Sequence, residues 1–176
     1  NDAPTASTDP ITTSEDTPVT GKVTGTDVDG DALTYTEQTP PSKGTVTIDP
    51  NTGEYTYTPN PDTTGEDSFT VEVNDGKGGT TTVEIIVNIT PENDAPVAGN
   101  STVTGDEDTP ITGKITATDK DGDPLTYTEQ TPPSKGTVTI DPNTGDYTYT
   151  PNPNATGEDS LTVEASDGNG GITTVQ

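Results

Sequence analysis

The sequence contains no cysteine, histidine, arginine, methionine or tryptophan, and only one phenylalanine. Without cysteine it has no disulfide scaffold, no thiolate nucleophile and no zinc–thiolate site. Without histidine it has no Ser-His-Asp triad, no imidazole metal ligand and no side chain that ordinarily titrates near neutral pH. No apolar run approaches the ~18 residues of a membrane span. No signal peptide is recognisable, so we expect the sequence to begin within a mature polypeptide.

Basic side chains are also scarce. Six lysines face 31 Asp and Glu residues, which gives a formal charge of −25, and a surface of this sign repels nucleic acid. With only 23% hydrophobic residues, composition alone favours disorder. Two features oppose that interpretation, because the few apolar residues recur with a strict period and the acids are clustered at points. An acidic chain that folds is expected to need a cation to offset its self-repulsion.

The chain consists of two copies of one unit. Asn1-Asp2-Ala3-Pro4 recurs 92 residues later as Asn93-Asp94-Ala95-Pro96, without a gap between the copies. The segment Leu33–Gly53 is identical to Leu125–Gly145 at every position. A period of this length is long enough for one small domain per copy, so the pattern predicts a tandem duplication of domains.

We expect repeat 1 to cover residues 1–91 and repeat 2 to cover residues 92–176, with a linker at about 90–96. The second copy ends at Gln176, which corresponds to Glu84. It therefore lacks the counterpart of the apolar run Ile85–Ile89, and we expect its last strand to be truncated.

Within each unit the apolar residues alternate with polar ones. Val46-Thr47-Ile48, Tyr55-Thr56-Tyr57 and Phe69–Val73 place apolar side chains on one face and Thr or Glu on the other, and no window has a period of 3.6 residues. Turn residues separate these runs every 8–12 residues. The pattern predicts an all-β protein of two tandem seven-strand antiparallel Greek-key β-sandwiches, with closed barrels as the alternative.

Aspartates gather in two loops of each predicted sandwich, at the end where its chain begins. Three alternate within five residues after the second strand, and another precedes the Gly-rich turn between the last two strands. The members are Asp27, Asp29, Asp31 and Asp75 in unit 1 and Asp119, Asp121, Asp123 and Asp167 in unit 2. Ca²⁺ takes 6–8 oxygen ligands in flexible geometry, so these loops are candidate calcium sites. The alternative is a set of polar turns, because Asp and Gly favour turns without any metal.

A second set of candidate ligands is expected at the other end of unit 1 and in the linker. The members are Glu15, Asp16, Glu66, Asp67, Glu92, Asn93 and Asp94. If the units stack end to end, these residues face the aspartates of unit 2 and share about two to three calcium ions with them, given 6–8 oxygens per ion. The corresponding loops of unit 1 have no preceding domain here, so we expect weaker binding there.

These elements resemble the cadherin repeat. Glu15–Val23 followed by Thr26–Asp29 is similar to its early Glu and Asp-x-Asp motif, Phe69–Gly76 to its late strand, and Pro91–Pro96 to its calcium-binding linker. Units that open with Asn-Asp-Ala-Pro and carry Asp-x-Asp-Gly-Asp resemble the bacterial cadherin-like (Ig-like) tandem repeats of large secreted RTX-type surface adhesins. The family's middle acidic motif is only loosely echoed, and Asn154 replaces Asp62 in unit 2.

The resemblance implies extracellular, calcium-rigidified extender repeats of a bacterial cell-surface adhesin, which support adhesion to surfaces or cells, as in a biofilm. It implies a monomer whose partners are neighbouring repeats of the same polypeptide and a distal adhesion target, with no nucleic acid and no direct membrane insertion. We expect no enzyme, because nothing places two carboxylates around a deep apolar pocket.

The runner-up function is a carbohydrate- or ligand-binding cadherin-like module of a secreted protein. Such sites usually present exposed aromatic platforms, whereas the period turns Tyr35, Tyr55 and Tyr57 inward. Rows of outward threonines such as Thr56 and Thr58 suit a flat ligand or ice face, but β-favouring residues at exposed strand positions explain them more simply.

Overall fold

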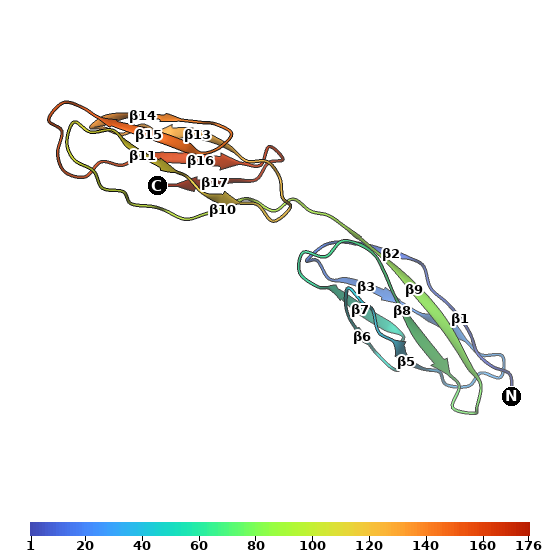
Figure 1. Ribbon diagram of the computed structural model, residues 1–176. Coiled ribbons are helices and arrows are strands. Elements are labelled where there is room, and N and C mark those ends of the chain that lie inside the picture. Colours follow the sequence, from blue (N-terminus) through green and yellow to red (C-terminus); the bar gives the residue numbers. More distant parts are fainter. The chain divides into compact units, whose positions relative to one another are not determined.

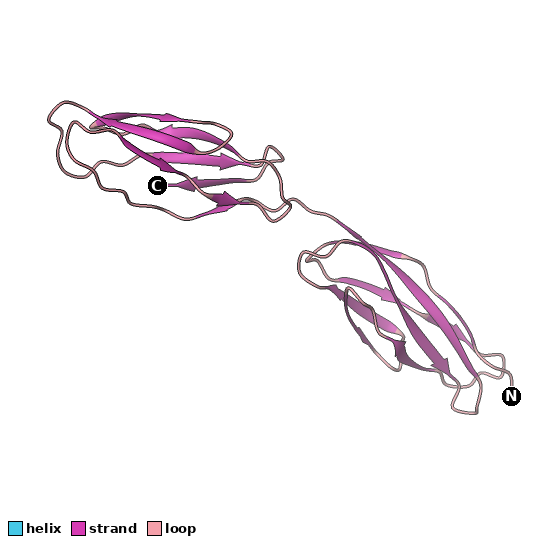
Figure 2. Cartoon of the chain, in the orientation of Figure 1, coloured by secondary structure: helices cyan, strands magenta, loops and turns pink.

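The computed structural model describes residues 1–176, which form strands and loops without any helix (Figure 2). The structure contains no helix that is long and apolar enough to span a membrane. The chain divides into two compact units, Asn1–Glu92 and Asn93–Gln176. Each unit is an all-β sandwich, so the predicted fold class is confirmed.

Unit 1 contains nine strands (Figure 1). They are β1 (Thr5–Ser7), β2 (Ile11–Ser14), β3 (Val19–Lys22), β4 (Thr24–Thr26), β5 (Thr34–Thr39), β6 (Gly44–Ile48), β7 (Glu54–Pro59), β8 (Gly65–Asn74) and β9 (Thr80–Thr90). One sheet has the order β2-β9-β8-β5, the facing sheet has the order β3-β7-β6, and β1 pairs with β4. Because β1 and β2 are two parts of one interrupted run, as are β3 and β4, the sandwich has the seven strands that the sequence predicts.

One pairing departs from the antiparallel expectation. The register between β2 and β9 is parallel and runs from Ile11 opposite Val87 to Ser14 opposite Thr90. Every other strand pair in unit 1 is antiparallel. The parallel pair joins the beginning of the unit to its end, so its two strands are far apart in the sequence.

Unit 2 contains eight strands. They are β10 (Val97–Ala98), β11 (Ile111–Lys114), β12 (Ala117–Thr118), β13 (Thr126–Thr131), β14 (Gly136–Ile140), β15 (Asp146–Pro151), β16 (Thr162–Ser166) and β17 (Ile172–Val175). Its sheets have the orders β11-β15-β14 and β13-β16-β17, and β10 pairs with β12. No counterpart of β2 forms, because β2 pairs with Val87–Thr90 and the corresponding positions lie beyond Gln176.

Aromatic residues fill the core of unit 1. The rings of Tyr55 and Phe69 meet edge to face with centroids 5.3 Å apart, and the rings of Tyr57 and Phe69 lie nearly parallel at 6.3 Å. Tyr35 is also buried, so the inward direction predicted for these three tyrosines is correct. The core of unit 2 contains fewer buried residues, and half-buried Leu161 stands where unit 1 has Phe69.

A buried carboxylate links the loop before β6 to β7 and β8. Asp67, only 5% exposed, accepts four hydrogen bonds at 2.8–2.9 Å. The backbone N–H and hydroxyl of Ser42 donate to Oδ1, while the backbone N–H of Lys43 and the phenol of Tyr57 donate to Oδ2. The same four bonds surround Asp159 in unit 2. This repeated arrangement fixes the loop between the two sheets.

These hydrogen bonds control the ionisation of the pair. Burial by itself raises the pKa of Asp67, but the bonds from Ser42, Tyr57 and Lys43 together outweigh burial and hold that pKa below its usual value. Burial and the neighbouring carboxylate raise the pKa of Tyr57. Asp67 is therefore ionised and Tyr57 is a neutral donor at neutral pH.

We predict that Asp67→Asn destabilises unit 1 by about 1–3 kcal/mol, because an amide cannot accept from all four donors. Since folding lowers the pKa of Asp67, its contribution is fully present above its unfolded pKa of about 4 and is lost as pH falls through the lower folded value. Chemical unfolding at neutral pH and at steps below pH 4 measures both effects.

The exposed variant Glu37→Gln removes one negative charge from β5 and serves as the matched control. Tyr57→Phe removes one of the four donors and should cost less than Asp67→Asn. Equal unfolding free energies for Asp67→Asn and Glu37→Gln at neutral pH would contradict a structural role for this carboxylate.

Candidate metal centre

The loop between β4 and β5 holds three carboxylates close together. Asp27 Oδ1 accepts the backbone N–H groups of Asp29 at 2.9 Å and Asp31 at 3.1 Å, which curls the loop around this side chain. Gly30 adopts a φ of +79°, a left-handed conformation that glycine allows without strain. One carboxylate oxygen from each aspartate lies within 4.8 Å of the other two.

The loop between β12 and β13 of unit 2 repeats this geometry. Asp119 Oδ1 accepts the N–H groups of Asp121 at 3.0 Å and Asp123 at 3.2 Å. Gly122 has the same φ of +79°, and the three carboxylates again converge within 4.8 Å. The three alternating aspartates that the sequence analysis grouped together therefore lie close together in both units.

The second carboxylate oxygen of the first aspartate in each loop distinguishes these loops from ordinary polar turns. Asp27 Oδ2 and Asp119 Oδ2 are buried and have no hydrogen-bond partner. A buried carboxylate oxygen without a donor is unfavourable by at least 1–3 kcal/mol, roughly the cost of an unsatisfied polar group. A cation held by the converging oxygens removes that cost, and a donor set made only of oxygen suits a hard ion such as Ca²⁺.

The loop between β8 and β9 contributes a fourth aspartate. Asp75 Oδ1 accepts the N–H groups of Lys77 at 2.7 Å and Gly79 at 2.9 Å, and Asn1 Nδ2 donates to Oδ2 at 2.9 Å. The hydrogen bond from Asn1, followed by those from the backbone, holds the pKa of Asp75 below its usual value. The counterparts in unit 2 are Asn169, Gly171 and Asn93 around Asp167, whose pKa is lowered in the same way.

The first residues of each unit lie on these loops. The backbone N–H of Asp2 donates to Asp29 Oδ2 at 2.8 Å, and that of Asp94 donates to Asp121 Oδ2 at 2.8 Å. Each unit thus brings its opening Asn-Asp, the alternating aspartates and the late aspartate to one end of its sandwich, as the seven-strand topology predicts.

Other candidate ligands lie at the opposite end of unit 1. Glu15 is buried, its N–H donates to Thr90 O at 2.9 Å, and its Oε1 accepts the N–H of Glu92 at 2.9 Å. Asp16 has a φ of +58°, and its Oδ1 accepts the N–H of Asp62 at 3.1 Å. Glu15, Asp16 and Glu92 are thus gathered around the end of β9.

Glu66 and Asp67 are placed differently by β8. Glu66 is exposed, whereas Asp67 points into the sandwich and uses both oxygens on Ser42, Lys43 and Tyr57. These donors were not predicted from the sequence. The alternation of β8 was the available signal, because it places Asp67 on the same inward face as Phe69.

One further side chain in each unit, which was not predicted from the sequence, contacts the third of the alternating aspartates. Lys77 Nζ lies 2.8 Å from Asp31 Oδ1 in unit 1, and Asn169 Nδ2 donates to Asp123 Oδ2 at 2.6 Å in unit 2. Comparing the late loops of the two copies, which read Asp-Gly-Lys-Gly-Gly and Asp-Gly-Asn-Gly-Gly, was the available signal.

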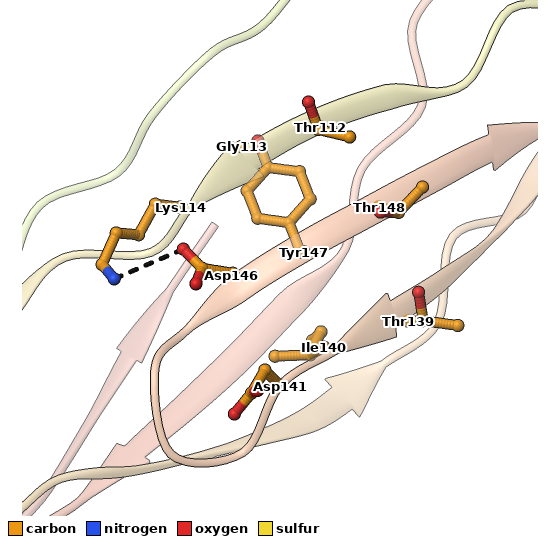
Figure 3. A pocket seen from close by; sticks show the side chains of 9 residues that line it. All are labelled: Thr112, Gly113, Lys114, Thr139, Ile140, Asp141, Asp146, Tyr147 and Thr148. Carbon is orange, nitrogen blue, oxygen red and sulfur yellow. Dashed lines mark ion pairs between the residues drawn. The ribbon is translucent and has the colours of Figure 1, made fainter.

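A shallow hollow on β11, β14 and β15 has a different character (Figure 3). Thr112, Thr139 and Thr148 line it, and Lys114 pairs with Asp146 at 3.3 Å at one side. The ring of Tyr147 lies against Gly113, where a side chain would overlap the phenol. Asp141, the other carboxylate of the hollow, accepts the N–H groups of Asn143 at 2.9 Å and Thr144 at 3.1 Å. Both carboxylates thus have partners, in contrast to the unpaired oxygens of the aspartate loops.

The matching family model is described as a bacterial Ig domain, and it covers residues 1–88 and again residues 93–176. The chain belongs to the bacterial Ig domain family. It consists of two Ig domains, which correspond to units 1 and 2.

Solved structures place these Ig domains among cadherin-like folds. Human protocadherin-24 EC1-2 matches with a TM-score of 0.66 and 21% identity, over 99% of this chain and 93% of that one. Mouse cadherin-23 EC22-24 matches with a TM-score of 0.57 and 21% identity, over 100% of this chain and 65% of that one. At these identities the likeness concerns the fold.

The chain spans 28% of the length of another match, the endo-fucoidan hydrolase MfFcnA4 from glycoside hydrolase family 107. That match covers 99% of this chain, with 23% identity and a TM-score of 0.42. No curated protein sequence matches the chain.

Proposed function

We propose that the two Ig domains are calcium-stabilised extender repeats of a large bacterial surface adhesin of RTX type. The observation that carries the proposal is the buried, unpartnered carboxylate oxygen of Asp27 and again of Asp119, each within a group of three aspartates. The same orphaned atom at equivalent positions of both domains is difficult to explain by a polar turn, because a turn satisfies its own buried groups.

The ligands of each proposed site come from one end of one sandwich. In domain 1 they are Asp27, Asp29, Asp31 and Asp75 with the opening Asn1-Asp2, and domain 2 supplies the residues 92 positions later. A bound Ca²⁺ supplies two positive charges and accepts 6–8 oxygens. The aspartates supply convergence, because Asp27 and Asp119 already hold their loops curled through two backbone N–H groups.

In this proposal, calcium binding stiffens the linker between the two domains. Glu92 is hydrogen-bonded to Glu15 in domain 1, while the next residues, Asn93 and Asp94, are hydrogen-bonded to Asp167 and Asp121 in domain 2. Consecutive linker residues are therefore fastened to different domains. Strengthening the acidic end of domain 2 with calcium would restrict the linker backbone and stiffen a chain of such repeats.

A non-enzymatic, extracellular role follows from the same proposal. Neighbouring repeats of the polypeptide are the expected partners, and a distal domain would bind the adhesion target. A domain that needs a divalent ion to relieve its own charge suits a calcium-rich exterior. The absence of cysteine means that folding there requires no disulfide formation.

We predict that calcium raises the melting temperature of the chain well beyond the effect of ionic strength. An ion that binds only the native state adds about 2.7 kcal/mol at a hundredfold excess over Kd. Calorimetry in millimolar CaCl₂ is compared with calorimetry in chelator plus NaCl at matched ionic strength. Identical midpoints under the two conditions would reject the calcium proposal.

We also predict that Asp121→Ala and Asp29→Ala have different mechanical effects. Asp121→Ala removes the acceptor of the Asp94 N–H and should free the linker while both sandwiches stay folded. Asp29→Ala makes the same change at the far end of domain 1, so it should lose an ion and leave the linker restrained. Small-angle scattering with and without calcium measures the maximum dimension, and circular dichroism checks the fold.

The stiffening role is refuted if both variants keep the maximum dimension and the calcium response of the unmodified chain. The stiffening role is supported if Asp29→Ala keeps the maximum dimension and the calcium response while Asp121→Ala loses them.

A further inference from the structure

A lysine side chain lies against the three alternating aspartates of domain 1. Lys77 extends from the β8–β9 loop, and its Nζ approaches Asp31 Oδ1 to 2.8 Å. The Asp31 side chain is only 18% exposed, whereas that of Lys77 is 62% exposed, so the ammonium group covers this carboxylate from the solvent side. The hydrogen bond to Asp31, with the charges of Asp31, Asp75 and Asp27, raises the pKa of Lys77.

Domain 2 has a neutral side chain in the same place. Asn169 Nδ2 donates to Asp123 Oδ2 at 2.6 Å, so the third aspartate has a partner from the late loop in both domains. The lysine neutralises one negative charge of the group and the asparagine neutralises none. The backbone hydrogen bonds and the φ of the loop glycine are otherwise the same.

We infer that Lys77 is a tethered counter-ion that competes with a divalent cation for Asp31, so that domain 1 binds the ion more weakly than domain 2. The inference rests on the proposed calcium sites and adds to that proposal, because it names a residue that lowers the affinity of one of them. Binding at domain 1 requires the ammonium group to leave Asp31 or to remain close to the ion, and either is unfavourable. Binding at domain 2 only requires Asn169 to give up a neutral hydrogen bond.

Two other cations lie near the acidic ends, each beside another of the proposed ligands. Lys120 Nζ lies 3.9 Å from Asp94 Oδ2 in domain 2, and the terminal ammonium group of Asn1 lies 4.0 Å from Asp29 Oδ2 in domain 1. The terminal ammonium weakens ion binding at domain 1, and Lys120 weakens it at domain 2, where domain 1 has Val28. The experiment therefore includes an N-terminally acetylated chain and the same chain with Lys120→Val.

The test is a CaCl₂ titration of the full chain followed by two-dimensional amide NMR. The amides of Gly30 and Gly122 report the two loops separately. In the unmodified chain, Gly122 should reach its midpoint at a lower calcium concentration than Gly30, and acetylation should preserve that order. Lys77→Asn should lower the Gly30 midpoint roughly ten- to thirtyfold, the effect of one unit charge about 4–6 Å from a divalent ion in a near-aqueous dielectric.

The reciprocal change provides the matched comparison. Asn169→Lys should raise the Gly122 midpoint by a similar factor and leave Gly30 unchanged, and the double exchange should reverse the order of the two midpoints. Lys22→Asn removes the same charge from an exposed pair with Glu54, 3.8 Å apart and outside the group, and should move neither midpoint by more than a small common factor.

The inference is overturned if Lys77→Asn leaves the Gly30 midpoint in place, or shifts it no more than Lys22→Asn does. It is also overturned if the two loops titrate together in the acetylated chain that carries Lys120→Val. A titration in which neither glycine responds to calcium has a different meaning, because it rejects the calcium sites themselves. Both lysines are exposed at the surface, and unchanged strand amides confirm that each variant is folded.

Discussion

Mutual repulsion among carboxylates is the constraint on which the rest of this structure depends. A chain with a charge of −25 can bury an aspartate only where a donor or a cation meets its oxygens. Asp67 meets this condition with four protein donors and ties two sheets together. Asp75 meets it with backbone N–H groups and one asparagine. Asp27 meets it at one oxygen only, and this difference is the reason for proposing an ion in that loop.

The sequence predicts those features that depend on local pattern. Alternation in Tyr55-Thr56-Tyr57 determines which side chains face inward, and the alternating aspartates curl their own loop through bonds to residues two and four positions away. Pairing between distant segments is not visible in such patterns. The parallel register of β2 with β9, and the donors that Ser42 and Tyr57 bring to Asp67, arise only when the sheets pack. Asp67 was therefore predicted as a candidate calcium ligand, although its position in the alternation of β8 places it on the inward face with Phe69.

Comparing the two copies shows which structural features depend on nearby residues and which depend on the complete sandwich. Domain 2 has no counterpart of β2 and buries fewer core residues, yet its aspartate loop repeats that of domain 1 down to the unpartnered oxygen of Asp119. The four bonds to Asp159 are also retained. The acidic end is thus built by short-range hydrogen bonds that need only the nearby strands, and its geometry is independent of how completely the far end of the sheet is formed.

Because the loop geometry is local, single substitutions can adjust one repeat without disturbing its neighbours. The two Ig domains share their alternating aspartates and differ at the residue that contacts the third one, Lys77 or Asn169. In the proposed sites, a lysine at this position would stabilise the calcium-free loop, because it offsets part of the repulsion among the aspartates. It would reduce the stabilisation gained on calcium binding for the same reason. A residue that raises the stability of the calcium-free loop would therefore lower its affinity for calcium. A tandem array that mixes the two residues would fill its sites over a wider range of calcium concentration than an array of identical repeats.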